Sequence, residues 1–271
     1  MPIHAQWLLF VGPGKTGTSW IDRVLRRTGG VCLPAKVKET FFFDRNFARG
    51  RDWYFHQFPS GRGGLRVEVA PTYFYAQDAP NRIRDTLPNV KIVVTLRDPV
   101  QRAISHYLNL RKYGRTALDI EDALEAFPGL IRQSLYVDRL AQWTETFGDV
   151  RVVFYEDVIG RVESLFRDAI PEVKQQPISN PGRVNGASVP RLRLASRVGQ
   201  FAAKTFRRAG LHRVVDMGKQ AGLKKVLFSG GTLPAKETLE EALQPWGPAF
   251  ADDQAALARL LGKHPPWQRL N

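Results

Sequence analysis

The sequence predicts an α/β protein in which a parallel sheet is flanked by helices and is followed by a helical, basic C-terminal part. Three observations predict this class. Short apolar runs alternate with stretches of helical periodicity, a glycine-rich turn joins the first run to the first such stretch, and positive charge is concentrated late in the chain. Such alternation is typical of βαβ units, whose strands are parallel and whose helices cover both faces of the sheet.

The strands and helices follow one another over the first 160 residues. Five apolar runs predict buried strands: Trp7–Val11, Val31–Leu33, Leu65–Val69, Lys91–Leu96 and Arg151–Tyr155. Three helices are expected, the first beginning at Thr18 or Ser19 and ending at Gly29-Gly30, the second from Pro99 to about Tyr113, and the third over Ser134–Phe147. We expect one domain over residues 1–271, with an α/β core at 1–160 and a mostly helical lid or substrate region at 177–271.

Charge and composition restrict the class of partner. The chain has 271 residues, 43% of them hydrophobic and 24% charged, with a formal net charge of +14. This composition is that of a folded globular protein, and the charge favours an anionic partner. Residues 183–225 hold eleven Lys and Arg but a single acid, Asp216. Apolar residues recur there at helical spacing, which predicts a basic helix, either a solvated face or a docking surface for an acidic partner or an anionic lipid surface.

Several classes are disfavoured. The single cysteine, Cys32, excludes an intrachain disulfide framework and a multi-cysteine zinc site, and the five histidines lack ligand spacing, so no metal is expected. Nucleic acid is disfavoured because the basic excess lies in one late segment without a familiar recognition motif. The N-terminus lacks the pattern of a signal peptide, and no apolar run reaches 18 residues. We therefore expect a cytoplasmic protein without a transmembrane segment.

The glycine-rich turn predicts an anion-binding, P-loop-like site. It reads GPGKTGTS from Gly12 to Ser19, between a buried strand and a helix. Glycines allow the backbone to approach an anion, and backbone N–H groups at the helix start can hold it. The candidate ligand-binding residues are Gly14, Lys15, Thr16, Gly17, Thr18 and Ser19.

Two nucleotide patterns fit this turn poorly. A full Walker motif needs a glycine five positions before Gly14, where Leu9 stands. The spacing of Gly12, Gly14 and Gly17 satisfies G-x-G-x-x-G, but a dinucleotide site also needs an acid at the end of the second strand, where Pro34 and its neighbours stand. A plain strand–helix turn would not need a lysine and three hydroxyl residues.

The turn instead resembles the 5′-phosphosulfate-binding loop of sulfotransferases that use 3′-phosphoadenosine 5′-phosphosulfate (PAPS). Four further segments resemble this family in the same order, the first two being similar to the heparan-sulfate-type enzymes. They are KETFFFD at Lys38–Asp44 with Gly50, Asp52-Trp53-Tyr54 and Phe58-Pro59, then EVAPTYF at Glu68–Phe74, KIVVTLRDPVQRAISHY at Lys91–Tyr107, and Ser134–Val158. The resemblance covers roughly residues 7–160.

The resemblance implies how the donor is bound. Arg97 follows a buried strand, and its planar guanidinium suits a phosphate; with Ser105 it would bind the 3′-phosphate. Trp20 and Tyr155 match positions that contact adenine, although core packing would also explain both aromatics. Arg183 lies in a late loop that would close over the nucleotide.

The resemblance also implies a set of catalytic residues. Glu39 would be the base that removes the proton of the acceptor, Lys38 would steady the sulfuryl oxygens, and Lys15 would stabilise charge on the bridging oxygen. Asp44 and Glu68 would lie behind these groups or face the substrate. Glycan enzymes have K-E-P-H where this chain has Thr40 and Phe41 after Lys38-Glu39, so the expected histidine is missing.

The function that follows is transfer of a sulfuryl group from PAPS to a hydroxyl or amine, releasing 3′,5′-bisphosphoadenosine (PAP), without a metal. The acceptor would be a small molecule, a saccharide or a lipid, and an acidic carrier protein could present it to the basic segment. Peripheral contact with a membrane is compatible with the same charge. The alternatives are a P-loop small-molecule kinase and a non-enzymatic protein that binds anions or a membrane surface.

Overall fold

The computed structural model describes residues 6–59, 64–160, 189–190, 230–231 and 233–267. These residues fall into two compact units. The first contains the described parts of residues 1–102, 133–185 and 247–271, and the second contains those of residues 103–132 and 186–246. The single-domain assignment stays a prediction.

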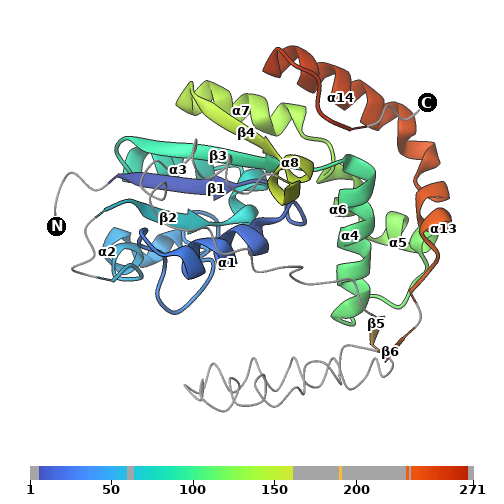
Figure 1. Cartoon of the computed structure of the whole chain (residues 1–271), viewed down its shortest axis with the longest axis horizontal. Coiled ribbons are helices and arrows are strands. Elements are labelled where there is room, and N and C mark those ends of the chain that lie inside the picture. The colour runs from blue at the N-terminus through green and yellow to red at the C-terminus, as the bar shows by residue number, and fades with distance from the viewer. Residues whose placement is uncertain (1–5, 60–63, 161–188, 191–229, 232, 268–271) are drawn as a thin grey trace. The chain divides into compact units, whose positions relative to one another are not determined.

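The first unit is built on a parallel four-stranded sheet (Figure 1). Its strands are β1 (Trp7–Val11), β2 (Arg66–Val69), β3 (Val90–Leu96) and β4 (Val150–Phe154), in the order β2-β1-β3-β4. The strands nearest the middle, β1 and β3, are almost wholly buried, as expected for continuous apolar runs in a parallel sheet. The predicted α/β class with a parallel sheet flanked by helices is therefore confirmed.

Helices connect the strands and cover the sheet. The first unit contains α1 (Thr18–Thr28), η1 (Phe47–Arg49), α2 (Arg51–Phe55), η2 (Pro71–Tyr75), α3 (Ala79–Thr86), α7 (Val137–Phe147), α8 (Tyr155–Gly160) and α14 (Gly247–Leu261). Helix α4 (Pro99–Lys112) begins in the first unit and continues into the second. The second unit also contains α5 (Ile120–Ala126), α6 (Gly129–Arg132), β5 (Val189–Pro190), β6 (Gly230–Gly231), α13 (Lys236–Glu241) and η4 (Gln244–Trp246).

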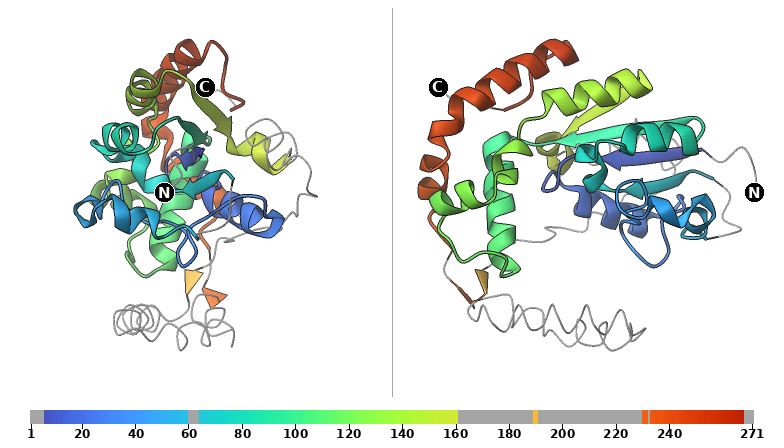
Figure 2. Two further views of the ribbon diagram at one scale, coloured as in Figure 1. Left: turned by 90° about the vertical axis from the view of Figure 1, so that its left-hand side faces the viewer. Right: turned by 180° about the vertical axis from the view of Figure 1, so that it is seen from behind.

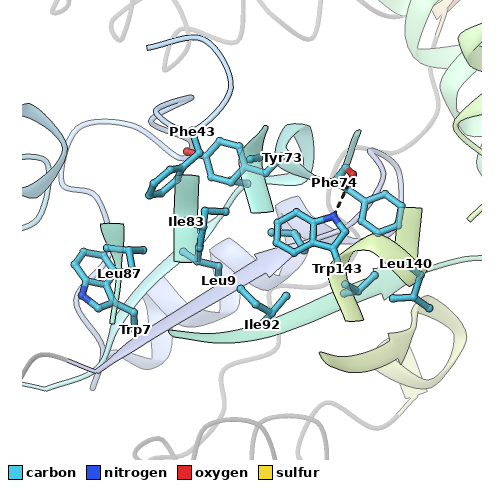
Figure 3. Close-up of a cluster of buried hydrophobic side chains, with 14 of the residues drawn as sticks. Trp7, Leu9, Phe43, Tyr73, Phe74, Ile83, Leu87, Ile92, Leu140 and Trp143 are labelled. Carbon is cyan, nitrogen blue, oxygen red and sulfur yellow. Dashed lines mark hydrogen bonds between the residues drawn. The ribbon is translucent and has the colours of Figure 1, made fainter. Parts of the chain in front are cut away.

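The side chains of each strand divide between two hydrophobic clusters. Leu8 and Phe10 of β1 belong to a cluster with Ile21 and Leu25 of α1. The alternate β1 residues, such as Leu9, belong to a larger cluster fed by α2, η2, α3, α7 and α14, part of which is shown in Figure 3. In the left view of Figure 2, along the strands, dark blue α1 lies on one side of the sheet and teal α3 on the other. Successive strand residues point to opposite faces, which accounts for the division.

Several expected boundaries differ from the structure, three strand starts by a single residue. Residues 31–33 do not form a strand: only Cys32 makes a bridge, to Arg66, and Pro34 lacks the N–H that would extend the ladder. The helix expected from Ser134 begins at Val137. Tyr155 begins α8 instead of ending β4. The short helices η1, α2 and η2 were not predicted, because η1 has only three residues and runs of aromatic residues in α2 and η2 hide a helical period.

The predicted basic segment at residues 183–225 falls, apart from Val189-Pro190, outside the described residues, so its helix stays a prediction. The described helices include none with the length and apolar character needed to cross a membrane.

Candidate active site

The loop between β1 and α1 is shaped by close backbone contacts. Gly12 has φ of +136°, and a Cβ there would lie 2.4 Å from the carbonyl oxygen of Thr95 in β3. Gly17 has φ of +88°, and a Cβ there would lie 2.9 Å from the ring of Tyr155. A side chain at either position would clash and would favour a different backbone, so both glycines are needed to form the loop.

Thr16 fastens the middle of the loop to the sheet. Its hydroxyl is fully buried, donates to the carbonyl of Pro13 at 2.7 Å and lies 2.7 Å from the hydroxyl of Thr95. The Thr16 side chain therefore holds the loop on β3, a role that the sequence did not reveal. Lys15 precedes it in a left-handed conformation with φ of +84°, which marks a sharp turn at the tip of the loop.

Helix α1 presents its N-terminus to this loop. Its N-cap is Gly17, no side chain caps the first turn, and no acidic residue lies in that turn. Backbone N–H groups and the helix dipole at such an end favour an anion. Thr18 is buried and Ser19 half-buried at the helix start, whereas Trp20 lies in the hydrophobic cluster beneath α1. Core packing is therefore an observed role of Trp20.

Arg97 joins the carboxyl end of β3 to the loop. Its Nη1 donates to the carbonyl of Lys15 at 3.2 Å, and its guanidinium lies 4.5 Å from the ring centroid of Tyr155. Its Nε is buried without a hydrogen-bond partner among the described residues. The structure thus brings Lys15, Gly17, Arg97 and Tyr155 together, as a site for a nucleotide at this edge of the sheet requires.

Two residues that the sequence analysis did not assign brace this arrangement. The hydroxyl of Tyr136 donates to the carbonyl of Arg97 at 2.7 Å. The backbone N–H groups of Tyr136 and Val137 donate to the carboxylate of Asp253 in α14, at 2.9 and 3.0 Å. Helix α14 therefore helps to hold the backbone of Arg97 through the first residues of α7.

Arg102 supports the loop from below and is fully buried. Its Nε donates to the hydroxyl of Ser134 at 2.6 Å, and its Nη1 lies 3.5 Å from the carbonyl of Gly14. Burial lowers the pKa of its guanidinium, because the charged form is poorly solvated there. These contacts give Arg102 a bracing role.

Lys38 and Glu39, the residues expected to act on the acceptor, form an ion pair in the first unit. The Lys38 ammonium lies 2.8 Å from Oε1 of Glu39, while Oε2 of Glu39 is buried without a partner among the described residues. Arg26 of α1 holds the segment just before them by donating to the carbonyls of Pro34 and Val37, at 3.0 and 2.9 Å. A carboxylate with one neutralised and one unused oxygen is suited to accept a proton.

Glu68 is connected to this segment through the backbone of Thr40. It is fully buried in β2, and its carboxylate accepts the N–H of Thr40 at 2.7 Å, the hydroxyl of Tyr54 at 3.0 Å and that of Tyr73 at 3.3 Å. Burial raises the pKa of Glu68 to about 7, and the hydrogen bonds it accepts oppose that rise. The observed contacts of Glu68 are therefore with protein groups, and its expected role in the site stays a prediction. Asp44 bonds locally instead, to the N–H of Arg45 at 2.8 Å.

Two further predicted donor-binding residues stay predictions. Ser105 is half-buried in the part of α4 that belongs to the second unit. Arg183 lies outside the described residues. In the described part of the chain, no cluster of three or more His, Cys, Asp or Glu side chains is placed to hold a metal ion.

Comparison with known proteins identifies the family. Residues 6–167 match the family model of the sulfotransferase domain. The chain is 29% identical over 166 residues to bifunctional heparan sulfate N-deacetylase/N-sulfotransferase 1 of Caenorhabditis elegans, covering 55% of this chain and 19% of that protein. It is 41% identical over 100 residues to heparan sulfate glucosamine 3-O-sulfotransferase 6 of Mus musculus, covering 36% of this chain and 29% of that protein. The chain thus spans less than a third of either relative.

A solved structure shares the fold. The crystal structure of a sulfotransferase from Alicyclobacillus acidocaldarius superposes with a TM-score of 0.65 at 20% identity, covering 97% of this chain and 98% of that chain. The family model covers nearly the same residues as the resemblance found in the loop, the K-E segment and the strand before Arg97. That resemblance is confirmed, and the chain belongs to the sulfotransferase domain family.

Proposed function

We propose that this chain transfers the sulfuryl group of PAPS to a hydroxyl or amine of an acceptor and releases PAP. The observation that carries the proposal is the contact of the Arg97 guanidinium with the carbonyl of Lys15 at 3.2 Å. The planar guanidinium, which suits one phosphate, lies beside a loop and helix N-terminus suited to a second anionic group. A nucleotide with anions at both its 3′ and 5′ positions matches this pair of sites.

Two buried polar atoms, one on Arg97 and one on Glu39, could bind the donor PAPS and the acceptor respectively. The Nε of Arg97 and the Oε2 of Glu39 are both buried without a partner within the described part of the chain. Leaving such atoms unpaired costs roughly 1–3 kcal/mol each. A 3′-phosphate that accepts from Nε and an acceptor hydroxyl that donates to Oε2 would satisfy them.

The chemistry requires positioning and charge stabilisation more than covalent catalysis. An acceptor oxygen or nitrogen forms a bond to sulfur while the bond from sulfur to the bridging oxygen breaks, and the electrons of that bond remain on the phosphate of PAP. Lys15 would stabilise charge on the bridging oxygen, and Lys38 would balance charge on the sulfuryl oxygens. The proton of the acceptor would pass to Oε2 of Glu39.

The acceptor that we propose is a saccharide or a small molecule with a free hydroxyl or amine. The relatives reported above are named for action on heparan sulfate, which supports the saccharide. Phe41 stands at the position of the histidine in glycan enzymes, with the Arg45 guanidinium 4.8 Å from its ring centroid. An aromatic ring at this position supplies an apolar contact surface, which widens the class to aromatic small molecules.

The function is tested by nucleotide selectivity and by group transfer. Calorimetry with PAP and with ATP is expected to show binding of PAP alone, and radiolabelled PAPS with a panel of acceptors is expected to label at least one of them. Binding of ATP without PAP would support the kinase. Salt-sensitive binding of anions that survives Arg97→Ala, without transfer, would support a non-enzymatic binder.

A further inference from the structure

The carboxylate of Glu68 lies on a face of β2 that packs against a hydrophobic cluster, where an apolar side chain is expected. Val67 and Val69 point into the cluster beneath α1, so Glu68 between them points to the opposite face. Its register partner Leu9 belongs to the hydrophobic cluster on that face, together with Phe42 and Phe43. Burying an ionised carboxylate among such side chains is unfavourable unless hydrogen bonds compensate for the lost water.

The groups around Glu68 are arranged as donors to an ionised carboxylate. The Thr40 N–H and the hydroxyls of Tyr54 and Tyr73 all reach its oxygens, and within the described part of the chain no ion pair to Glu68 is found. An ionised carboxylate can accept all three bonds, whereas a protonated one must also donate. Protonation therefore adds an O–H donor to a network built of donors, and this O–H is satisfied only if a neighbouring hydroxyl reorients to accept it.

The same network fixes the backbone that carries Glu39. Thr40 directly follows Glu39, and its carbonyl accepts from the side chain of Asn46 at 2.9 Å. Two residues on, the N–H of Phe42 donates to the hydroxyl of Tyr73 at 3.0 Å. Between these anchors Phe41 has φ of +52°, a conformation that costs about 1–3 kcal/mol and persists only when its surroundings enforce it.

We propose that Glu68 is a positioning residue for Glu39: its ionised carboxylate, by accepting the Thr40 N–H, fixes the backbone of the base, and its protonation loosens that backbone and slows transfer. The proposal rests on the function proposed above. It separates two roles, because Glu39 would touch the acceptor whereas Glu68 would act only through the Thr40 backbone.

The pKa of Glu68 lies in a range where the effect of its protonation on activity can be measured. Burial raises its pKa to about 7. The titratable groups that face it are Tyr54 from α2 and Tyr73 from η2, and burial raises the pKa of both hydroxyls well above the usual value, so both remain donors at neutral pH. Arg66 on β2 is the cation that acts on Tyr54 in this network. Activity should thus rise with pH as Glu68 loses its proton.

The first test compares wild type with Glu68→Gln, which keeps one oxygen for the Thr40 N–H but cannot ionise. At pH 8 kcat is expected to fall roughly tenfold, as when a charge-assisted hydrogen bond becomes neutral, and the acid limb near pH 7 should disappear. The dissociation constant of PAP should stay within twofold of wild type. Glu145→Gln, at an exposed position on α7, is the matched control and should behave as wild type.

A second variant removes one partner but leaves the Thr40 bond intact. The hydrogen bond from Tyr54 lowers the pKa of Glu68, so Tyr54→Phe should move the acid limb to higher pH while kcat at high pH is retained. A purely structural role of the network does not predict such a shift. The proposal is overturned if folded Glu68→Gln keeps the kcat and acid limb of wild type, or if Tyr54→Phe lowers kcat equally at every pH.

Hydrogen exchange separates this proposal from the proposed function. Peptides covering residues 36–46 are expected to exchange faster in Glu68→Gln than in wild type at pH 8, with the difference vanishing at pH 5.5. Equal exchange at both pH values would overturn the positioning role even if PAPS is the donor. Faster exchange in a protein that fails to bind PAP would instead reject the proposed function and keep the link between Glu68 and the loop.

Discussion

Replacing Arg97 removes the contact between the loop and the guanidinium that we propose to bind the two anionic groups of PAP. In Arg97→Ala the guanidinium no longer donates to the carbonyl of Lys15 or stacks on Tyr155, and the 3′-phosphate of PAP loses its planar donor. The backbone of Arg97 should stay in place, because Tyr136 holds its carbonyl and not its side chain.

The size of the effect follows from the hydrogen bonds lost. A hydrogen bond to a charged group contributes about 1.5–3 kcal/mol, and a bidentate contact with phosphate would supply two such bonds. At roughly 1.4 kcal/mol per tenfold change, a loss of about 3 kcal/mol weakens PAP binding about 150-fold. Arg97→Lys keeps the charge but not the fork, so we expect about a tenfold loss.

Isothermal titration calorimetry with PAP at fixed salt measures both variants. Arg23→Ala, at an exposed position on α1, removes the same charge away from the loop and is the matched control. Lys15→Ala keeps the contact with Arg97, because Arg97 donates to the backbone carbonyl of Lys15 and not to its side chain. Lys15→Ala should therefore weaken PAP binding less than Arg97→Ala. Affinity within threefold of wild type in Arg97→Ala would refute the placement of the 3′-phosphate.

Three further outcomes are expected. Glu39→Gln should lower kcat by about 100-fold or more in a radiolabelled PAPS assay with PAP affinity unchanged, and full turnover would remove Glu39 as the base. Tyr136→Phe frees the carbonyl of Arg97 and should weaken PAP binding about fivefold in calorimetry with little change in kcat; a purely kcat effect would contradict this. Burial raises the pKa of Glu68 from 4.5 to about 7 in the folded state, so protonated Glu68 stabilises the fold at low pH, and about 3 kcal/mol of this stability is lost as pH rises from 4.5 to 7. Urea unfolding at pH 4.5 and 8 should show this loss in wild type but not in Glu68→Gln. An equal change of unfolding free energy with pH in both proteins would argue against it.

The parts of the fold that could be predicted are those set by neighbouring residues. Largely apolar runs identify β1, β3 and β4, because strands of a parallel sheet that is covered on both faces consist mostly of apolar residues. The expected strand at residues 31–33 was wrong because three apolar residues before a proline satisfy the pattern without room for a ladder. Helices α2 and η2 were not predicted because each has three consecutive aromatic residues, all in or against one hydrophobic cluster, and such a run shows no helical period.

In the candidate site, too, features set by neighbouring residues could be predicted and contacts between distant residues could not. The glycine loop and Arg97 were predictable, since both lie beside strand ends where ligands bind in such sheets. The bracing residues were not, because Tyr136 contacts Arg97 across 39 residues and Asp253 contacts Tyr136 across 117. One signal was available for Glu68: in an alternating strand, it is the carboxylate on the face opposite two valines.

Gly12 and Gly14 of the loop differ in whether the fold leaves room for a side chain. A methyl group at Gly12 would lie 2.4 Å from the oxygen of Thr95, whereas one at Gly14 would meet nothing within 4 Å. A mutational library at position 12 should therefore lose expression together with turnover. A library at position 14 should give well-expressed proteins whose activity depends only on how a new side chain crowds the donor, which makes position 14 the place to begin engineering for altered donors.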